Sequence, residues 1–175
     1  MKESDRHVDI REYDPAWPSR FEEERAGLLR LFKGTIAGVE HIGSTAIPGL
    51  AAKPIIDVMV GVQELLADER LLSDLRGFGY EYFGEYGIPG RHFFRKGDPR
   101  THHLHWVRFG GEFWEEHLLF RDYLRAHPEE ARRYEELKRG LALRYVEDRR
   151  SYTASKTGFI REVLAKAQRG KSGVS

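Results

Sequence analysis

Cysteine is absent from this sequence of 175 residues. Its absence excludes disulfide bonds, thiol catalysis and zinc sites built on cysteine. Long apolar runs are absent as well, because none approaches the roughly 20 residues that a transmembrane helix needs. Residues 1–7 are too polar for a secretory signal. We therefore expect a cytoplasmic protein that makes no contact with a membrane.

An excess of charge of one sign is also missing. The chain has 29 basic and 28 acidic residues, so its net charge of +1 gives it no overall attraction for nucleic acid. Hydrophobic residues make up 40% and charged residues 33%, which is typical of a soluble globular domain. We expect a single domain over residues 8–168, with flexible termini at 1–7 and 170–175. The composition does not fix the number of subunits.

Hydrophobic periodicity predicts short strands that alternate with amphipathic helices, followed by a helical C-terminal third. The predicted strands cover residues 8–13, 35–42, 54–60, 80–83, 91–96 and 101–109. Five helices are predicted. The first begins near residue 18, the second covers 64–76, the third covers 112–126, the fourth begins at 128, and the last covers 151–168.

The stretch 41–60 combines a turn of small residues with a buried strand that contains one acid. Gly43 and Ser44 leave little bulk in the turn, so nearby backbone amides and the Thr45 hydroxyl could surround an anion. Asp57 lies within a run of Ile, Val and Met, where a carboxylate is costly to bury without a cation or hydrogen-bond donors. The pattern favours a metal-phosphate site, and a plain surface turn with a capping aspartate is the alternative.

A predicted hairpin near the middle of the chain is rich in arginine and histidine. Strand alternation places Arg91 and Arg95 on one face of its first strand, and His103 and His105 on one face of its second. Guanidinium groups suit phosphate oxygens, and imidazoles suit metal binding or proton transfer. A solvated hairpin with hydrogen-bonded histidines is the alternative. If the histidines share a face with Asp57, the three side chains converge.

Several short segments are typical of one family. They read YDPAW at 13–17, EHIGST at 40–45, PGLAAKPIID at 48–57, HLH at 103–105 and HLLFRDYL at 117–124. On these segments the chain resembles the GrpB family of the nucleotidyltransferase (polymerase-beta-like) superfamily, over about residues 8–164. The resemblance implies a nucleotidyltransferase-like α/β (α+β) fold, with a mixed, mostly antiparallel sheet, packed helices and a helical C-terminal third.

The resemblance also implies a metal site, which this sequence matches incompletely. Enzymes of the superfamily follow the Gly-Ser turn with two strand carboxylates at positions i and i+2, which together hold two magnesium ions. Asp57 matches the first carboxylate, but the i+2 position is Met59, which cannot bind magnesium. Glu40, at the end of the preceding strand, could supply the second carboxylate.

Histidines could replace the missing carboxylate instead. His103 and His105 match the His-x-His of the family, and His41 stands beside the Gly-Ser turn. A site of one aspartate and several histidines favours manganese, zinc or iron over magnesium. The predicted cofactor is therefore a divalent ion (Mg, Mn or Zn), with these ligands: Asp57, His103, His105, His41 and Glu40.

Two functions follow from the resemblance. The first is binding of a small nucleotide or phosphate ligand with metal-dependent nucleotidyl transfer, in which Asp57, His103 and His105 are catalytic. The second is a non-catalytic binding or assembly domain that kept the cleft, as in fusions to dephospho-CoA kinase. The predicted phosphate-binding residues are Gly43, Ser44, Thr45, Lys53, Arg91 and Arg95. Lys156 matches a family motif on the last helix and could also reach the cleft.

Overall fold

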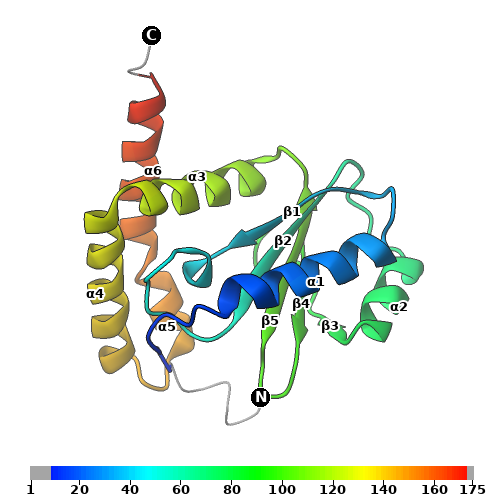
Figure 1. Ribbon diagram of the computed structural model, residues 1–175, viewed down its shortest axis with the longest axis horizontal. Helices are drawn as coiled ribbons and strands as arrows, with labels where there is room; N and C mark the ends of the chain where they lie inside the picture. The colour runs from blue at the N-terminus through cyan, green and yellow to red at the C-terminus, as the bar shows by residue number, and fades with distance from the viewer. Residues whose placement is uncertain (1–8, 173–175) are drawn as a thin grey trace.

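The computed structural model describes residues 9–172 and contains one five-stranded sheet (Figure 1). The strand order is β1-β2-β5-β4-β3, in which β2 and β5 are parallel and the other neighbours are antiparallel. The strands are β1 (Ile36–Ile42), β2 (Ile56–Val62), β3 (Tyr80–Tyr82), β4 (Arg91–Lys96) and β5 (His102–Arg108). The predicted α+β fold with a mixed, mostly antiparallel sheet is confirmed.

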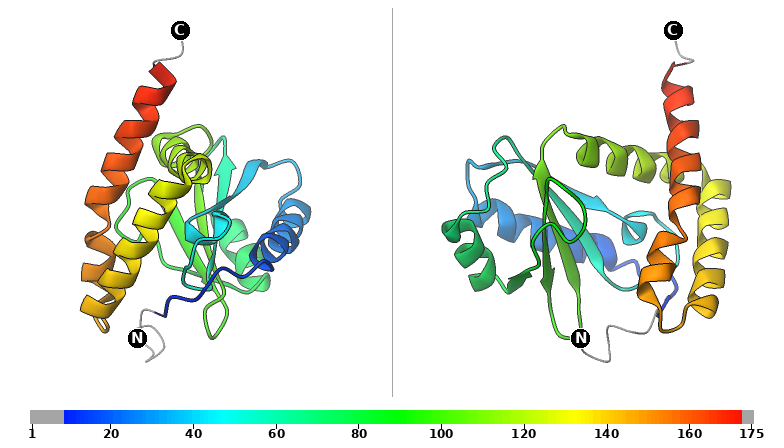
Figure 2. Two further views of the ribbon diagram at one scale, coloured as in Figure 1. Left: turned by 60° about the vertical axis from the view of Figure 1, so that its left-hand side comes forward. Right: turned by 180° about the vertical axis from the view of Figure 1, so that it is seen from behind.

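Helices cover both faces of the sheet and extend beyond one end of it (Figures 1 and 2). They are α1 (Trp17–Leu31), the 3-10 helix η2 (Ser44–Ala46), α2 (Glu69–Gly77), α3 (Glu112–Ala126), α4 (Pro128–Arg144), α5 (Arg149–Ala154) and α6 (Thr157–Ser172). Helices α1 and α2 lie on one face and α3 on the other, while α4, α5 and α6 stand beside the end of the sheet. Within residues 9–172 no helix has the length and apolar character needed to cross a membrane.

The predicted strand over residues 8–13 is wrong. Within the described residues it is reduced to an isolated bridge between Arg11 and Ala52, whose amides and carbonyls bond each other at 2.9 Å. The predicted last helix is divided into α5 and α6, and α6 continues to Ser172. The prediction of flexibility for residues 1–7 and 173–175 lies outside the described residues.

Helix α2 begins five residues later than predicted, at Glu69 instead of residue 64. The cause is an N-cap: the Asp68 carboxylate accepts a hydrogen bond of 2.9 Å from the Leu71 amide. Such a cap satisfies an amide that the helix itself leaves without a partner, so it fixes the first turn.

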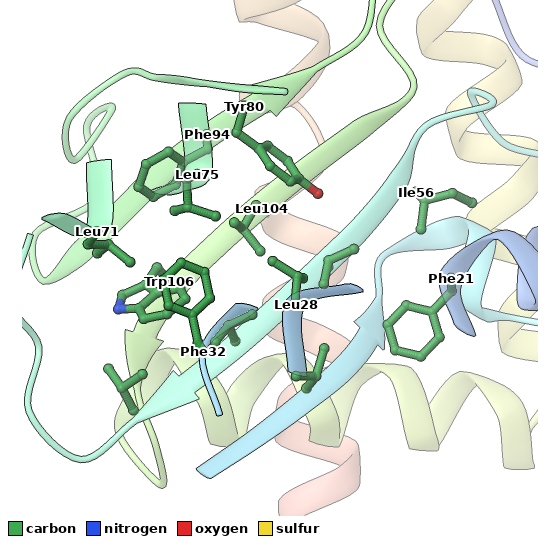
Figure 3. Close-up of a cluster of buried hydrophobic side chains, with 14 of the residues drawn as sticks. Phe21, Leu28, Phe32, Ile56, Leu71, Leu75, Tyr80, Phe94, Leu104 and Trp106 are labelled. Atoms are coloured by element: carbon green, nitrogen blue, oxygen red, sulfur yellow. The ribbon is translucent and has the colours of Figure 1, made fainter. Parts of the chain in front are cut away.

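The main core lies between the sheet and helices α1 and α2 (Figure 3). Strand alternation directs Val58 and Val60 of β2, and Leu104 and Trp106 of β5, toward this face, and all four are buried. Phe32, which follows α1, packs against the Trp106 ring with centroids 5.1 Å apart. The residues between these positions therefore point to the opposite face, under α3.

Two glycines allow α3 to approach that opposite face closely. Gly38 of β1 and Gly61 of β2 lie under the Trp114 side chain, which is 4% exposed. A Cβ atom on Gly61 would lie 2.7 Å from Trp114 Cζ3 and 2.8 Å from Phe109 Cδ2. Any larger residue would push the helix away from the sheet, since protein interiors are close-packed.

We expect Gly61→Ala to lower the free energy of unfolding by roughly 1–3 kcal/mol, the usual cost of overpacking a core. The control is Gly140→Ala on an exposed part of α4, where a Cβ would meet nothing within 4 Å. That change should stabilise the helix by up to about 1 kcal/mol. Urea unfolding followed by circular dichroism measures both. Equal stability of Gly61→Ala and the parent would mean that Trp114 does not pack against the strand.

Candidate functional site

Strand pairing brings three predicted site residues into one row on the α3 side of the sheet. Asp57 of β2 pairs with His103 of β5, which pairs with Arg95 of β4. On the other side Asp57 faces Ile42 of β1. The next row along the sheet consists of Glu40, Met59, His105 and Phe93. The predicted convergence of the histidines on Asp57 therefore results from the parallel pairing of β2 with β5.

Both histidines bond the same carboxylate oxygen. Oδ1 of Asp57 lies 3.0 Å from His103 Nδ1 and 3.4 Å from His105 Nε2. The Asp57 side chain is 27% exposed. Burial alone would raise the pKa of Asp57, but its hydrogen bonds to His103 and His105 hold it well below its ordinary value. The carboxylate is therefore ionised throughout the physiological range.

His105 connects Asp57 to the arginine at the start of β4. Arg91 Nη1 donates to His105 Nδ1 at 3.4 Å, so the other ring nitrogen carries the proton that His105 directs at Asp57. His117 of α3 lies beside this ring, with centroids 6.4 Å apart, and donates from Nδ1 to the Phe113 carbonyl at 2.7 Å. Burial and the nearby His105 lower the pKa of His117 to about 4. His117 is therefore neutral at pH 7.

The Gly43 backbone packs directly against Asp57. Its φ of 72° lies in the left-handed region, and a Cβ atom there would be 2.6 Å from Asp57 Oδ2. Only glycine lets the turn approach the carboxylate so closely. Gly43 and the following Ser44 are both half-buried in this turn. The side of Asp57 that the histidines do not bond therefore faces the turn.

Two other residues of the Gly-Ser segment are engaged elsewhere. His41 packs on the α1 side of the sheet, where its ring stacks on Phe21 with centroids 4.8 Å apart. His41 Nε2 lies 2.9 Å from Thr45 Oγ1, and that hydroxyl also donates to the Ile55 carbonyl at 3.4 Å. Burial lowers the pKa of His41 to about 4. His41 and Thr45 are both buried, so they support the turn from the α1 side of the sheet.

The predicted replacements for the second carboxylate are also occupied. Glu40 Oε2 accepts a hydrogen bond of 2.6 Å from Arg121 of α3, which also bonds Asp122 and the His41 carbonyl. Met59 is 0% exposed and belongs to the core under α3. In the part of the chain that the structure describes, no three His, Asp or Glu side chains are grouped so that they could hold a metal ion.

The two predicted phosphate-binding arginines have other partners. Arg91 is 6% exposed and donates to the backbone carbonyls of Glu85 and Tyr86 at 3.1 and 3.0 Å. Arg95 lies over aromatic rings, with its Cζ 4.2 Å from the Phe83 centroid. Arg91 thus holds a loop, while Arg95 keeps a half-buried position beside His103.

A wall of lysines and tyrosines stands on the other side of Ser44. The Tyr134 hydroxyl of α4 lies near the Ser44 side chain. Lys53 Nζ and Lys156 Nζ lie 4.9 and 4.7 Å from the ring centroid of Tyr152 in α5. We refer to Lys53, Tyr134, Lys138, Tyr152 and Lys156 as the lysine–tyrosine wall. Its lysines come from three separate segments, so the fold gathers positive charge next to the turn.

Lys138 is the buried member of this wall. It is 2% exposed, and its Nζ donates to the Ala51 carbonyl at 2.5 Å. Burial and the charge of Lys156 lower the pKa of Lys138 to about 7. The sequence contains a signal for this residue that the periodicity analysis missed. Lys138 lies in the apolar stripe of α4, at helical spacing from Ala131, Tyr134 and Leu141, where a lysine is unusual.

A separate groove of about 540 Å³ lies between α4 and the loop that follows η2. It is lined by Ile47–Leu50 and by side chains of α3 and α4, among them Arg125 and Arg132. Asp57 and the histidines are not part of its lining. The groove is therefore distinct from the site on the sheet.

Comparisons with known proteins agree on one family. The profile of the family described as "GrpB protein" matches residues 7–166. The chain is 41% identical over 169 residues to YqkA of Bacillus subtilis, covering 96% of this chain but 49% of YqkA, so it spans about half the length of that relative. A crystal structure of the conserved protein GrpB from Enterococcus faecalis is 42% identical, with a TM-score of 0.84, and the match covers 93% and 99% of the two chains.

A more distant relative is a named enzyme. The chain is 27% identical over 181 residues to dephospho-CoA kinase of Mycolicibacterium paratuberculosis, and the match covers 88% of this chain and 44% of that protein. More than half of that protein therefore lies outside the match.

Proposed function

This chain belongs to the GrpB family, and we propose that it binds the phosphate groups of a small nucleotide-like ligand between the Gly43–Ser44 turn and the lysine–tyrosine wall. The observation that carries the proposal is the gathering of Lys53, Lys138 and Lys156 around two tyrosines beside Ser44.

Like charges that a fold brings together repel, and this repulsion contributes to the lowered pKa of Lys138. A bound phosphate would relieve the repulsion and would raise the pKa of Lys138. Lysine ammonium groups and hydroxyl donors are also the groups that proteins use to hold phosphate oxygens. Because Lys138 is almost fully buried, its contribution is its charge, while Lys53 and Lys156 are half-buried.

The side chains around Asp57 do not fit the two-metal centre of nucleotidyl transfer. Met59 is a core residue, Glu40 is paired with Arg121, and one ring nitrogen of each histidine is directed at Oδ1 of Asp57. The proposed binding therefore involves no metal ion. Lysines take the charge-balancing role that magnesium has in metal-dependent transferases.

This donor set favours a binding or assembly domain over a nucleotidyltransferase. The relative named dephospho-CoA kinase contains a matching region next to a long unmatched part, which is the arrangement expected of a ligand-binding domain attached to a separate enzyme. Met59 favours the binding or assembly domain, because a transferase of this fold would need an acid there.

Titration calorimetry with sodium tripolyphosphate, in EDTA at pH 7.5, tests the proposal. We expect the parent to bind and Lys156→Gln to bind roughly three- to tenfold more weakly, as for the loss of one charge-assisted contact. The control, Lys33→Gln, removes the same charge from the exposed turn after α1 and should bind like the parent. The absence of tripolyphosphate binding by the parent would refute the proposal.

A further inference from the structure

The loop between β3 and β4 holds an exposed aromatic ring in an unusual backbone conformation. Tyr86 has a φ of 47°, the positive-φ region that residues with side chains rarely adopt. It is 57% exposed, although tyrosine rings usually gain from burial. Backbone strain of this kind persists where the surrounding structure fixes it, and it gathers at ligand-binding sites.

Arg91 fixes the conformation of this loop. Its Nη2 donates to the carbonyls of Glu85 and Tyr86 at 3.1 and 3.0 Å, and the Gly90 amide donates to Glu85 Oε1 at 2.8 Å. The opposite end of the guanidinium bonds His105, which bonds Asp57. The loop is thus tied to the site on the sheet, and Tyr86 is held in place before any ligand arrives.

The Tyr86 ring contacts other side chains of the protein, but much of its surface stays exposed. Its ring stacks on Phe93, with centroids 5.2 Å apart and planes inclined by 23°. Phe93 in turn contacts the rings of His103 and His105 at 5.2 and 5.3 Å. Arg95 Cζ lies 4.6 Å from the Tyr86 centroid. The result is a stack of two aromatic rings and a guanidinium that begins at the histidines of the site and ends at the surface.

From these contacts we infer that Tyr86 and Arg95 form a stacking subsite for the base of a nucleotide whose phosphates bind at Ser44 and the lysine–tyrosine wall. The inference rests on the proposed function and adds the substrate class, since a planar heteroaromatic group distinguishes a nucleotide from other phosphate ligands. Bases stack on tyrosine rings and on arginine guanidinium planes in nucleic-acid and nucleotide sites.

The position of the subsite suits this ligand. Arg95 lies two strands away from Asp57 in the same cross-strand row, which is about 10 Å at the usual strand spacing. The ribose would then lie over His103, between the base and the phosphates. The alternative is that the aromatic rings only stabilise the loop. In that case the base of a nucleotide would make no contribution to binding.

Calorimetric titrations with ATP and with tripolyphosphate, each in EDTA, distinguish the stacking subsite from a loop that is packed only for stability. In the parent we expect ATP to bind about tenfold more tightly than tripolyphosphate, the usual gain from stacking one base. Tyr86→Ala should lose that gain and leave tripolyphosphate binding unchanged. Tyr86→Phe is the matched control, because it keeps the ring and should bind both probes like the parent.

Each other outcome overturns at least one of the two proposals. If tripolyphosphate binds but ATP binds no better, or if Tyr86→Ala weakens both probes equally, the stacking subsite is wrong and phosphate binding stands. If neither probe binds the parent, the proposed function is wrong and the subsite falls with it. If ATP binds in a Tyr86-dependent way and tripolyphosphate does not bind, the base is recognised here and the phosphate site is wrong.

Discussion

The variant Met59→Asp is expected to lose at least about 4 kcal/mol of unfolding free energy, a large part of what a domain of this size has. Met59 is fully buried, and Ile42, Val107 and Trp114 surround it in the core under α3. An aspartate would place an ionised group among these side chains, and the neighbouring acid Glu40 is already held by Arg121. The result would be an unpaired buried charge.

Urea unfolding measures this loss, and Met59→Leu is the control. Leucine has a similar volume and no charge, so it should cost less than about 1.5 kcal/mol. The same samples should be melted with and without magnesium. We expect magnesium to leave the melting temperature of Met59→Asp unchanged. A rise in the variant but not in the parent would show that the new acid shares an ion with Asp57, and that the fold retains a metal centre.

Strand alternation in the sequence is sufficient to predict which side chains share a face. It separates His103 and His105 from Leu104 and Trp106, and the structure places the first pair on the α3 side and the second pair in the main core. The order of the strands is not predictable in the same way. Pairing of β2 with β5 joins residues 46 positions apart in the chain, so it depends on the packing of the whole domain.

The direction of hydrogen bonds within the site also escapes sequence analysis. An aspartate near two histidines has the composition of a metal site, but here both rings bond one carboxylate oxygen. Likewise Glu40 has the composition of a second ligand, yet Arg121 of α3, 81 residues away in the chain, binds it. Residue types indicate which chemistry a site can support, and tertiary contacts decide which groups are left for a ligand.

The lysine–tyrosine wall is the third part of the site that the sequence predicts incompletely. Among its five members, only Lys53 and Lys156 are suggested as ligand contacts by their positions in family segments. Tyr134, Lys138 and Tyr152 become part of the site because α4 and α5 pack beside the Gly-Ser turn. A lysine in an apolar stripe is the signal that sequence analysis should have used, since Lys and Arg are almost never fully buried without a partner.

Removing the charge of Asp57 should strengthen phosphate binding. This result would distinguish phosphate binding by lysines from phosphate binding through a metal ion held by Asp57. In Asp57→Asn the amide oxygen can still accept hydrogen bonds from His103 and His105, so the melting temperature at pH 8 should change little. The carboxylate faces the Gly43–Ser44 turn and repels any anion bound there. If lysines balance the phosphate charge, affinity for tripolyphosphate in EDTA should rise about tenfold.

The control for this change is Asp74→Asn on α2, at the far face of the sheet, which removes the same charge and should leave the affinity unaltered. Both variants and the parent are titrated at pH 8, in EDTA and again with magnesium or manganese. If Asp57 holds a divalent ion, as its resemblance to the superfamily carboxylate implies, the parent will gain affinity when metal is added and Asp57→Asn will lose that gain. The sign of the affinity change on Asp57→Asn therefore tells whether the carboxylate repels the ligand or binds it through an ion.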